Sequence, residues 1–328
     1  MNTVQGELPP PVKAVIKGAY ALQKLRVSTG NRVCSAFRCK LGMLKGMTYD
    51  EAELDKNEKL KEKILKMIYD DFKVVIAGGK RRKRSIIEDR RVTDDILEDT
   101  IYDQWKTLTP SILISDLSEY LLVRNYHNLL TTEKKSFTEL GTLLTETNDF
   151  YNAWLKHVHG IGPAMAGVLL STINIYKAKY PSSIHKLAGY DVVTVTDKDG
   201  NEKQEGRNKT KQHLIKVKYI DKEGVEQEKD SITFKPFLKT KMKVIETSFL
   251  RSGNQDYRTV YDNYKNRLLN QPRFKDQEKV LAHVNNMALR YMGKRFLTDL
   301  YVAWKKHENL PVSEEYYISK LGMTPHGQ

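Results

Sequence analysis

Residues Leu155–Leu170 read LKHVHGIGPAMAGVLL, and this stretch decides how the chain is interpreted. It fills every place of the pattern h-x-x-h-x-G-h-G-x-x-x-A-x-x-h-h, in which h is an apolar residue, and this spacing is typical of a helix-hairpin-helix motif. Gly160 and Gly162 permit a turn too tight for a Cβ atom, and Ile161 fills the space between the two helices. Pro163 suits the first turn of the second helix because no N–H is needed there.

The same turn predicts a binding site for anions. Backbone N–H groups from Gly160 to Ala164 would lie at the positive end of a helix dipole, which suits a phosphate of nucleic acid. Such contacts hold the backbone without reading bases, so we expect binding that is independent of base sequence. Lys156, His157 and His159 flank the turn and add to the site. The two histidines are not expected to bind metal, because the segment offers no further ligands.

The composition favours a folded, basic protein. The 328 residues include 55 Lys and Arg against 41 Asp and Glu, which gives a formal net charge of +14 at pH 7. A chain of this length corresponds to about two domains. The contents of 40% hydrophobic and 29% charged residues differ from those of a disordered protein. The positive charge attracts polyanions, and nucleic acid is the commonest of these inside cells.

The sequence does not predict secretion or a membrane partner. Its apolar stretches are shorter than the roughly 20 residues that a membrane helix needs, and Lys13 and Lys17 interrupt the first apolar pattern. Cys34 and Cys39 are too few for a disulfide framework, and no nearby histidine completes a zinc site. We therefore expect a cytoplasmic protein with reduced thiols.

The amino-terminal region, residues 1–150, is predicted to be helical. Apolar residues recur at helical spacing from Pro11 to Leu25, and after a break at Ser28–Gly30 the pattern continues through Cys39. Further helices are predicted over residues 49–76, 94–106, 111–130 and 133–158.

Two basic segments extend the predicted interface beyond the turn. The first lies in a loop predicted over residues 80–91 and consists of Lys80, Arg81, Arg82, Lys83 and Arg84. Such a run is either a solvated linker or an arm that contacts phosphates. The second is a helix predicted over residues 279–307, which carries Arg290, Lys294, Arg295 and Lys305 away from its apolar face, and the first three are assigned to the interface.

The regions after the motif differ from one another in predicted secondary structure. The motif itself occupies residues 151–190, and the alternating segments that follow predict two β-hairpins within residues 191–237, with turns at Lys198-Asp199-Gly200 and Lys222-Glu223-Gly224. Residues 238–328 are again helical and basic in pattern. The sequence therefore predicts a mainly α protein, a helical bundle with a helix-hairpin-helix motif and a small β-hairpin insert.

The stretch Ala153–Tyr190, AWLKHVHGIGPAMAGVLLSTINIYKAKYPSSIHKLAGY, resembles the carboxyl-terminal domain of the insertion-sequence transposases of the "IS-one-ten" class. In that domain a GIGP turn, an apolar helix, a loop with an aromatic residue and a Ser-containing helix that ends in Ala-Gly follow one another. Residues 238–268 and 282–306 are similar to the final helices of that family. The resemblance covers about the last half of the chain.

The resemblance implies further features, some of which this sequence lacks and some of which lie at other positions in it. The family carries an amino-terminal RuvC-like domain with a DEDD set of carboxylates for divalent metal, a serine nucleophile and a guide RNA. Here no early strand bears an Asp, and the acidic residues from Asp94 to Asp103 are spaced like a solvated helix face. The family's serine stands in a Ser-Gly context between the Ala-Gly helix and the basic helix, where this sequence has its β insert. Ser231 lies in that region and Ser252-Gly253 supplies the dipeptide later in the chain, and neither serine is carried over as a nucleophile. Mg²⁺ is expected only if the chain is catalytically active, and no other cofactor is identified.

The predicted function is nucleic-acid binding by a protein of transposase-like origin, which grips the phosphate backbone and acts in DNA recombination or transposition. DNA is the expected partner, and the sequence leaves room for RNA and for a homo-oligomer. One alternative is an active transposase or recombinase whose catalytic groups the sequence does not locate, although catalysis by this chain alone is not expected. Another is a structural or interaction protein in which the turn is an αα-hairpin of the core.

Overall fold

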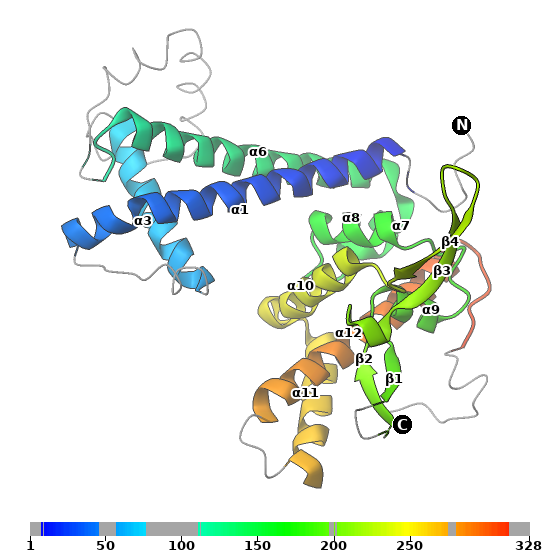
Figure 1. Cartoon of the computed structure of the whole chain (residues 1–328). Helices are drawn as coiled ribbons and strands as arrows, with labels where there is room; N and C mark the ends of the chain where they lie inside the picture. The colour runs from blue at the N-terminus through cyan, green and yellow to red at the C-terminus, as the bar shows by residue number, and fades with distance from the viewer. Residues whose placement is uncertain are drawn as a thin grey trace. The chain divides into compact units, whose positions relative to one another are not determined.

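The structure is a computed structural model that describes residues 8, 10–45, 57–76, 111, 113–196, 200, 202–274 and 280–314 (Figure 1). In these ranges the chain is mainly helical with two small antiparallel hairpins, which confirms the predicted mainly α class. None of the helices described there is long and apolar enough to cross a lipid bilayer. The predictions for the basic run Lys80–Arg84 and for the helix over residues 94–106 lie outside the described residues.

The elements follow one another along the chain. The α-helices are α1 (Pro10–Lys45), α3 (Glu58–Ile76), α6 (Leu117–Thr147), α7 (Asp149–Ala153), α8 (Pro163–Thr172), α9 (Pro181–Leu187), α10 (Pro236–Ser252), α11 (Gln255–Leu269) and α12 (Val280–His307). Short 3-10 helices are η1 (Leu155–His157), η2 (Lys211–His213) and η3 (Pro272–Phe274). The strands are β1 (Val192–Thr196), β2 (Glu202–Gly206), β3 (Ile215–Ile220) and β4 (Glu226–Ser231).

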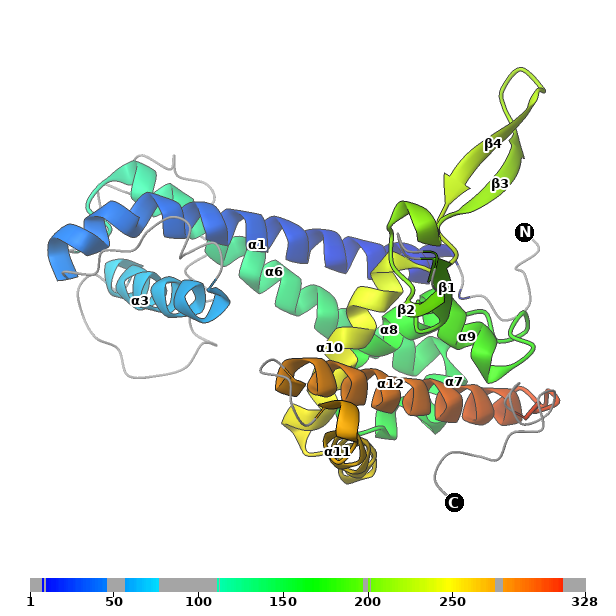
Figure 2. The same ribbon diagram turned by 60° about the horizontal axis from the view of Figure 1, so that its bottom comes forward.

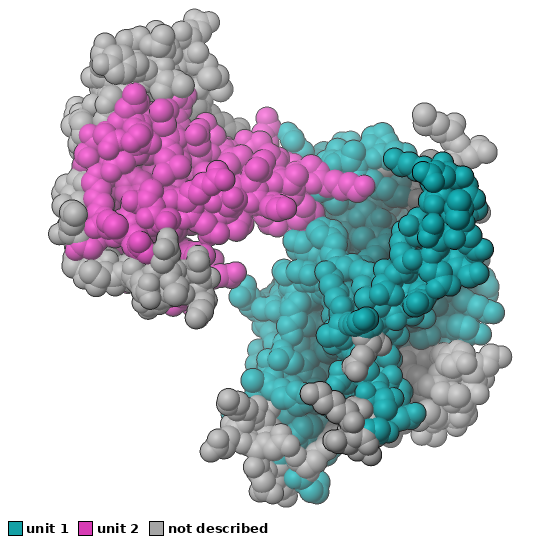
Figure 3. All heavy atoms as spheres, in the orientation of Figure 1, with its two compact units in different colours: residues 1–16, 138–328 teal, residues 17–137 magenta. Residues whose placement is uncertain are grey.

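The chain divides into two compact units (Figure 3). Residues 17–137 form the first, here called the helical unit, and residues 1–16 with 138–328 form the second, here called the carboxyl-terminal unit. Both boundaries fall inside helices, because α1 and α6 each contribute residues to both units.

An apolar cluster from α1, α3 and α6 holds the helical unit together. Its fully buried members include Phe37, Leu41, Ile64, Ile68, Phe72 and Val123. The break predicted at Ser28–Gly30 is wrong, since α1 runs without interruption from Pro10 to Lys45. Gly30 serves packing instead, because a Cβ atom at this position would lie 3.0 Å from Cε2 of Tyr126.

The helix boundaries before the motif also differ from the prediction. The segments predicted as separate helices, 111–130 and 133–158, are joined by α6, which continues to Thr147. Asn148 then begins α7, because its side-chain oxygen accepts a hydrogen bond from the Tyr151 amide at 2.7 Å. The glycine turn is therefore preceded by a short helix and a 3-10 turn, rather than by one long helix.

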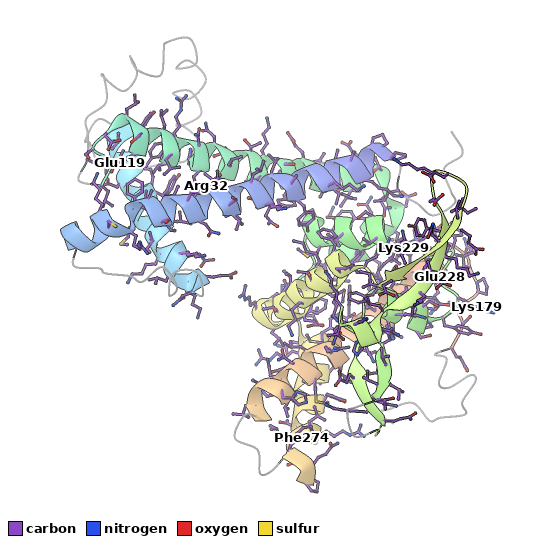
Figure 4. The ribbon with its side chains drawn as sticks, viewed as in Figure 1. Arg32, Glu119, Lys179, Glu228, Lys229 and Phe274 are labelled. Atoms are coloured by element: carbon purple, nitrogen blue, oxygen red, sulfur yellow. The ribbon has the colours of Figure 1, made fainter. Side chains whose placement is uncertain are left out.

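The carboxyl-terminal unit is built around α12, which packs against α9, α10 and α11. Phe249 of α10, Tyr257 of α11 and Phe296 of α12 form an aromatic cluster with ring centroids 4.5–5.6 Å apart. A second cluster joins Leu268 and Val284 to Phe274, which is labelled in Figure 4. The helix predicted over residues 279–307 is thus confirmed over the range Val280–His307.

Both predicted β-hairpins are present. β1 pairs with β2 from Val192↔Gly206 to Thr196↔Glu202, and β3 pairs with β4 from Ile215↔Ser231 to Ile220↔Glu226. The second turn is held by Asp221, whose Oδ1 accepts the amides of Glu223 and Val225 at 2.9 Å each.

The two hairpins differ in burial. β1 contributes the buried Val195 to the core, whereas every residue of β3 and β4 is exposed or half-buried. Figure 2 shows the β3–β4 ribbon projecting from the helices of its own unit. Its paired side chains include Lys216 and Lys218 on β3, and Glu228 and Lys229 on β4, of which the last two are labelled in Figure 4.

Candidate nucleic-acid interface

The two glycines of the turn have different roles. Gly160 has φ +99°, and a Cβ atom there would lie 2.8 Å from Ser252 Oγ and 3.0 Å from Phe249 Cδ1. Gly162 is exposed, has φ −93° and ψ 174°, and a Cβ atom on it would meet nothing within 4 Å. The prediction that both glycines are required by the turn is therefore correct for Gly160 and wrong for Gly162, whose extended backbone any residue adopts.

The second helix begins as the sequence predicts, and its first turn offers amide donors. Gly162 is the N-cap of α8 and Pro163 follows in the first helical turn. The Ile161 amide is taken up by the turn, since it donates to the Val158 carbonyl at 2.9 Å. Among the described residues, the amides of Gly162 and Met165 have no hydrogen-bond acceptor. The donor set is therefore narrower than the continuous run from Gly160 to Ala164 that the sequence predicts.

The flanking side chains are placed around this helix start. Lys156 and His157 are exposed on η1, and His159 is exposed in the turn itself. Ile161 is buried with 7% exposure, as expected for a residue that fills the space under a hairpin. The structure therefore brings together a cation, two imidazoles and the amino-terminal end of α8.

The turn is fastened to the carboxyl-terminal end of α10. Ser248 Oγ donates to the Gly160 carbonyl at 2.7 Å, and Asn254 Nδ2 donates to the His159 carbonyl at 2.8 Å. Asn254 also caps α11 by accepting the Tyr257 amide. These bonds fix the position of the turn on α10 through its carbonyl groups and do not use the amides of α8.

The cations predicted on α12 are placed differently from one another. Arg290 is half-buried, with its guanidinium carbon 5.4 Å from the centroid of the Tyr190 ring. Lys294 is also half-buried. Arg295 is exposed and forms an ion pair with Asp299, with Nε 3.2 Å from Oδ1. Only Arg295 among the three therefore presents an exposed side chain.

A buried polar pair lies between α10 and the loop before β1. The Tyr190 hydroxyl donates to Oε1 of Glu246, whose side chain has no exposed surface. Burial raises the pKa of both groups, and the neighbouring glutamate raises the pKa of Tyr190 further. Gly293 of α12 leaves room for the pair, because a Cβ atom there would lie 2.6 Å from Glu246 Oε1. Among the described residues, no group of three or more His, Cys, Asp or Glu is placed to hold a metal ion.

The two serines considered as nucleophiles lie in ordinary structural positions. Ser252 Oγ donates to the Phe249 carbonyl at 3.3 Å in the last turn of α10, and Gly253 ends that helix in the left-handed conformation with φ +71°. Ser231 is the last residue of β4 and pairs with Ile215.

Sequence reasoning missed the cations of α10. This helix and its N-cap carry Lys235, Lys239, Lys241, Lys243 and Arg251. The signal was visible in the sequence, where the run Leu238–Lys243 reads LKTKMK and a single acid occurs in the whole helix. The contact of the turn with Ser248 is what makes these cations neighbours of the site, and no sequence pattern indicated it.

Comparisons of the chain with protein-family models, with curated proteins and with solved structures find no match. The resemblance to the transposase class therefore stays a prediction from the motifs. The functional interpretation rests on the glycine turn, on the charges around it and on the contacts of α10.

Proposed function

We propose that this chain binds nucleic acid by its phosphate backbone through a helix-hairpin-helix centred on Gly160–Gly162, and that it is a protein of transposase-like origin acting in DNA recombination or transposition. The observation that carries the proposal is the exposed Gly162 at the N-cap of α8, with open space where a side chain would be. DNA is the proposed partner, with RNA as the second candidate.

The proposed contact follows from the chemistry of a helix start. The amides at the beginning of α8 point along the positive end of its dipole, where an anion is stabilised. A glycine at the N-cap lets a phosphate approach these amides more closely than a residue with a Cβ atom would. Lys156 adds a positive charge beside them, and the net charge of +14 attracts the polyanion from a distance.

A structural role for the turn is the competing interpretation, and specific contacts favour it. Ser248 and Asn254 bind the carbonyls of Gly160 and His159, so the turn also fastens α8 to α10 and α11. Under this interpretation the amides of Gly162 and Met165 bind no ligand. The two interpretations make opposite predictions for Gly162, because Gly162 is the turn residue that packing does not constrain.

The deciding variant is Gly162→Val. A valine side chain has open space at this position and fits the extended backbone, so the melting temperature should stay within a few degrees of wild type. If a phosphate approaches the amides, the valine blocks it and binding of a fluorescein-labelled DNA falls about tenfold or more, the effect of losing roughly one charge-assisted hydrogen bond.

Two further variants complete the test. Lys156→Ala should weaken binding and reduce the slope of log K against log salt by about one unit. Lys203→Ala, which removes another exposed lysine, one that pairs with Glu205 on β2, is the control and should leave both quantities unchanged. Wild-type affinity in Gly162→Val would show that the turn is structural, and failure of the wild-type chain to bind any nucleic acid would overturn the proposed function as a whole.

A further inference from the structure

The helix α10 is strongly basic. The one acidic residue of this helix, Glu246, has no exposed surface, so the helix presents cations without an exposed acid of its own. On the neighbouring helix α11, Arg258 forms an ion pair at 3.3 Å with Asp262, whose side chain is partly exposed. On α10, by contrast, the acidic partner of Lys243 is the buried Glu246, with Nζ 4.0 Å from Oε2. The positive charge of this helix favours a ligand with negative charge.

A row of side chains follows one side of α10. Its members alternate in spacing of four and three residues, so they lie on the same side of the helix: Phe237, Lys241, Val244, Ser248 and Arg251. We call these residues the α10 row. Phe237 and Val244 are 44% and 45% exposed, and Arg251 is exposed at the far end. The Nζ atom of Lys241 lies 5.6 Å from the centroid of the Phe237 ring.

The α10 row adjoins the glycine turn. Ser248, a member of the row, donates to the Gly160 carbonyl at 2.7 Å, and Ser252 in the next turn lies against Gly160. At a rise of 1.5 Å per residue, the row extends about 16 Å from Ser248 to Phe237. A nucleic-acid strand bound at the start of α8 would therefore meet Lys241 and then the exposed ring of Phe237 along α10. Arg251 lies on the other side of Ser248, and Figure 1 shows α10 beside α8.

We propose that the α10 row binds an unpaired nucleic-acid strand, with Lys241 and Arg251 contacting phosphates and a base stacking on Phe237. An aromatic face stacks on a base only when that base is not covered by its neighbours, so the row selects single strands over duplexes. Alternation of cations with an exposed aromatic residue is the usual composition of surfaces that bind single strands. This inference rests on the proposed function and specifies its ligand.

The test measures binding of the full chain to three fluorescein-labelled probes: an oligothymidylate, an oligouridylate of the same length and a mixed-sequence duplex. Phe237→Leu keeps an apolar side chain and removes the stacking face, so its affinity for the two single strands should fall about tenfold. Its affinity for the duplex should stay within twofold of wild type. Phe237→Trp, which restores a stacking face, should bind single strands at least as tightly as wild type.

The matched control is Tyr219→Leu on the β3–β4 ribbon. Tyr219 is 40% exposed and has the Nζ atom of Lys229 4.7 Å from its ring centroid, so it resembles Phe237 in both exposure and cation contact but lies in the ribbon rather than on α10. This variant should bind all three probes as wild type does. The double variant Lys241→Ala with Arg251→Ala should reduce the salt slope for single strands by about 1.4 units, because each phosphate that a cation neutralises adds about 0.7 to that slope.

The outcomes separate this proposal from the proposed function. The proposal for the α10 row is overturned if Phe237→Leu binds single strands as tightly as wild type, or if Tyr219→Leu loses as much affinity as Phe237→Leu. In either case, a loss of affinity in Gly162→Val would still support the turn as a binding site. Tighter binding of the duplex than of both single strands by wild type also overturns the row. Comparison of the two single-strand probes assigns the ligand to DNA or RNA. Equal melting temperatures of all variants are required, and Phe237→Trp supplies the second measurement if Phe237→Leu is unstable.

Discussion

The carboxyl-terminal unit has two polar regions that differ in their exposure to water. One consists of the polar groups in the interior between α9, α10 and α12, and the other is the side of α10 that carries the α10 row. Glu246 and Tyr190 are buried and bond to each other, and the half-buried His185 contacts the Lys294 carbonyl, with Nε2 3.1 Å from the oxygen. Lys241 and Arg251 lie on the same helix as Glu246 but reach its surface, half-buried and exposed respectively. A buried polar group acts on stability because its desolvation must be compensated, whereas a surface cation acts mainly on ligands. Variants in the two regions should therefore change different measurements.

The largest expected effect concerns His185. Burial, and secondarily the charge of Lys294, lower the pKa of His185 to about 4, from an ordinary value of 6.5. The unfolded chain binds a proton between pH 6.5 and 4 while the folded chain does not, so stability falls as the pH decreases through this range, by up to about 3 kcal/mol. Denaturant unfolding at several pH values checks this loss. His185→Gln, which keeps a side-chain donor for the Lys294 carbonyl, should remove this part of the pH dependence, and an unaltered profile in that variant would assign the loss to other groups.

The next effect is expected from Gly293→Ala. The added Cβ atom would lie 2.6 Å from Glu246 Oε1 and 2.9 Å from Tyr190 Cε2, so the buried pair must move. We expect a loss of about 2 kcal/mol in the free energy of unfolding, although alanine favours a helix by about 1 kcal/mol over glycine. Gly18→Ala in α1 is the control, because a Cβ atom there meets nothing within 4 Å, and it should raise stability. A gain in both variants would show that the pair tolerates displacement.

A smaller effect, of opposite sign, is expected from Glu246→Gln. Burial raises the pKa of Glu246, so at neutral pH the folded state holds an unfavourable charge. The amide removes this charge and keeps an acceptor for the Tyr190 hydroxyl, so stability at pH 7 should rise by on the order of 1 kcal/mol. The gain should shrink as the pH falls through the raised pKa, because the wild-type carboxyl is then neutral in the folded state. Thermal unfolding at pH 7 and pH 4.5 checks both statements, and a destabilised variant at pH 7 would show that the charge is compensated.

The smallest change in stability is expected on the outer side of α10. Lys241→Ala and Arg251→Ala replace side chains at the surface, so each should alter the free energy of unfolding by no more than about 0.5 kcal/mol. The same denaturant measurement used for Gly293→Ala checks this. A loss as large as that of Gly293→Ala would remove the distinction between the two regions.

Much of the fold was predictable because helices and hairpins depend on local spacing. The helix over 279–307 and both β-hairpins follow directly from periodicity and turn residues. The positions at which helices end were less predictable, because they depend on contacts with residues distant in sequence. The sequence around Gly30 predicts a helix break, but in the structure the small size of Gly30 accommodates the ring of Tyr126 within a continuous helix.

The candidate site was predictable in its residues and less so in its geometry. The motif correctly indicated the turn, Pro163 at the start of α8 and a buried Ile161. It did not indicate that Gly160 is constrained by Phe249 and Ser252 while Gly162 is unconstrained, since that difference arises from the packing of α10. For the same reason, nothing in the sequence pattern indicated that the basic helix α10 lies against the turn.

The β3–β4 ribbon has a practical consequence. Its turn is closed by the Asp221 side chain and by Gly224 with φ +83°, and the residues from Lys222 to Asp230 are all exposed. Exposed loop tips tolerate inserted sequence better than packed segments do. A short epitope introduced after Glu223 should therefore leave the core of the unit intact. The epitope would attach the protein to a sensor surface through the ribbon, so that neither the turn nor the α10 row takes part in the attachment.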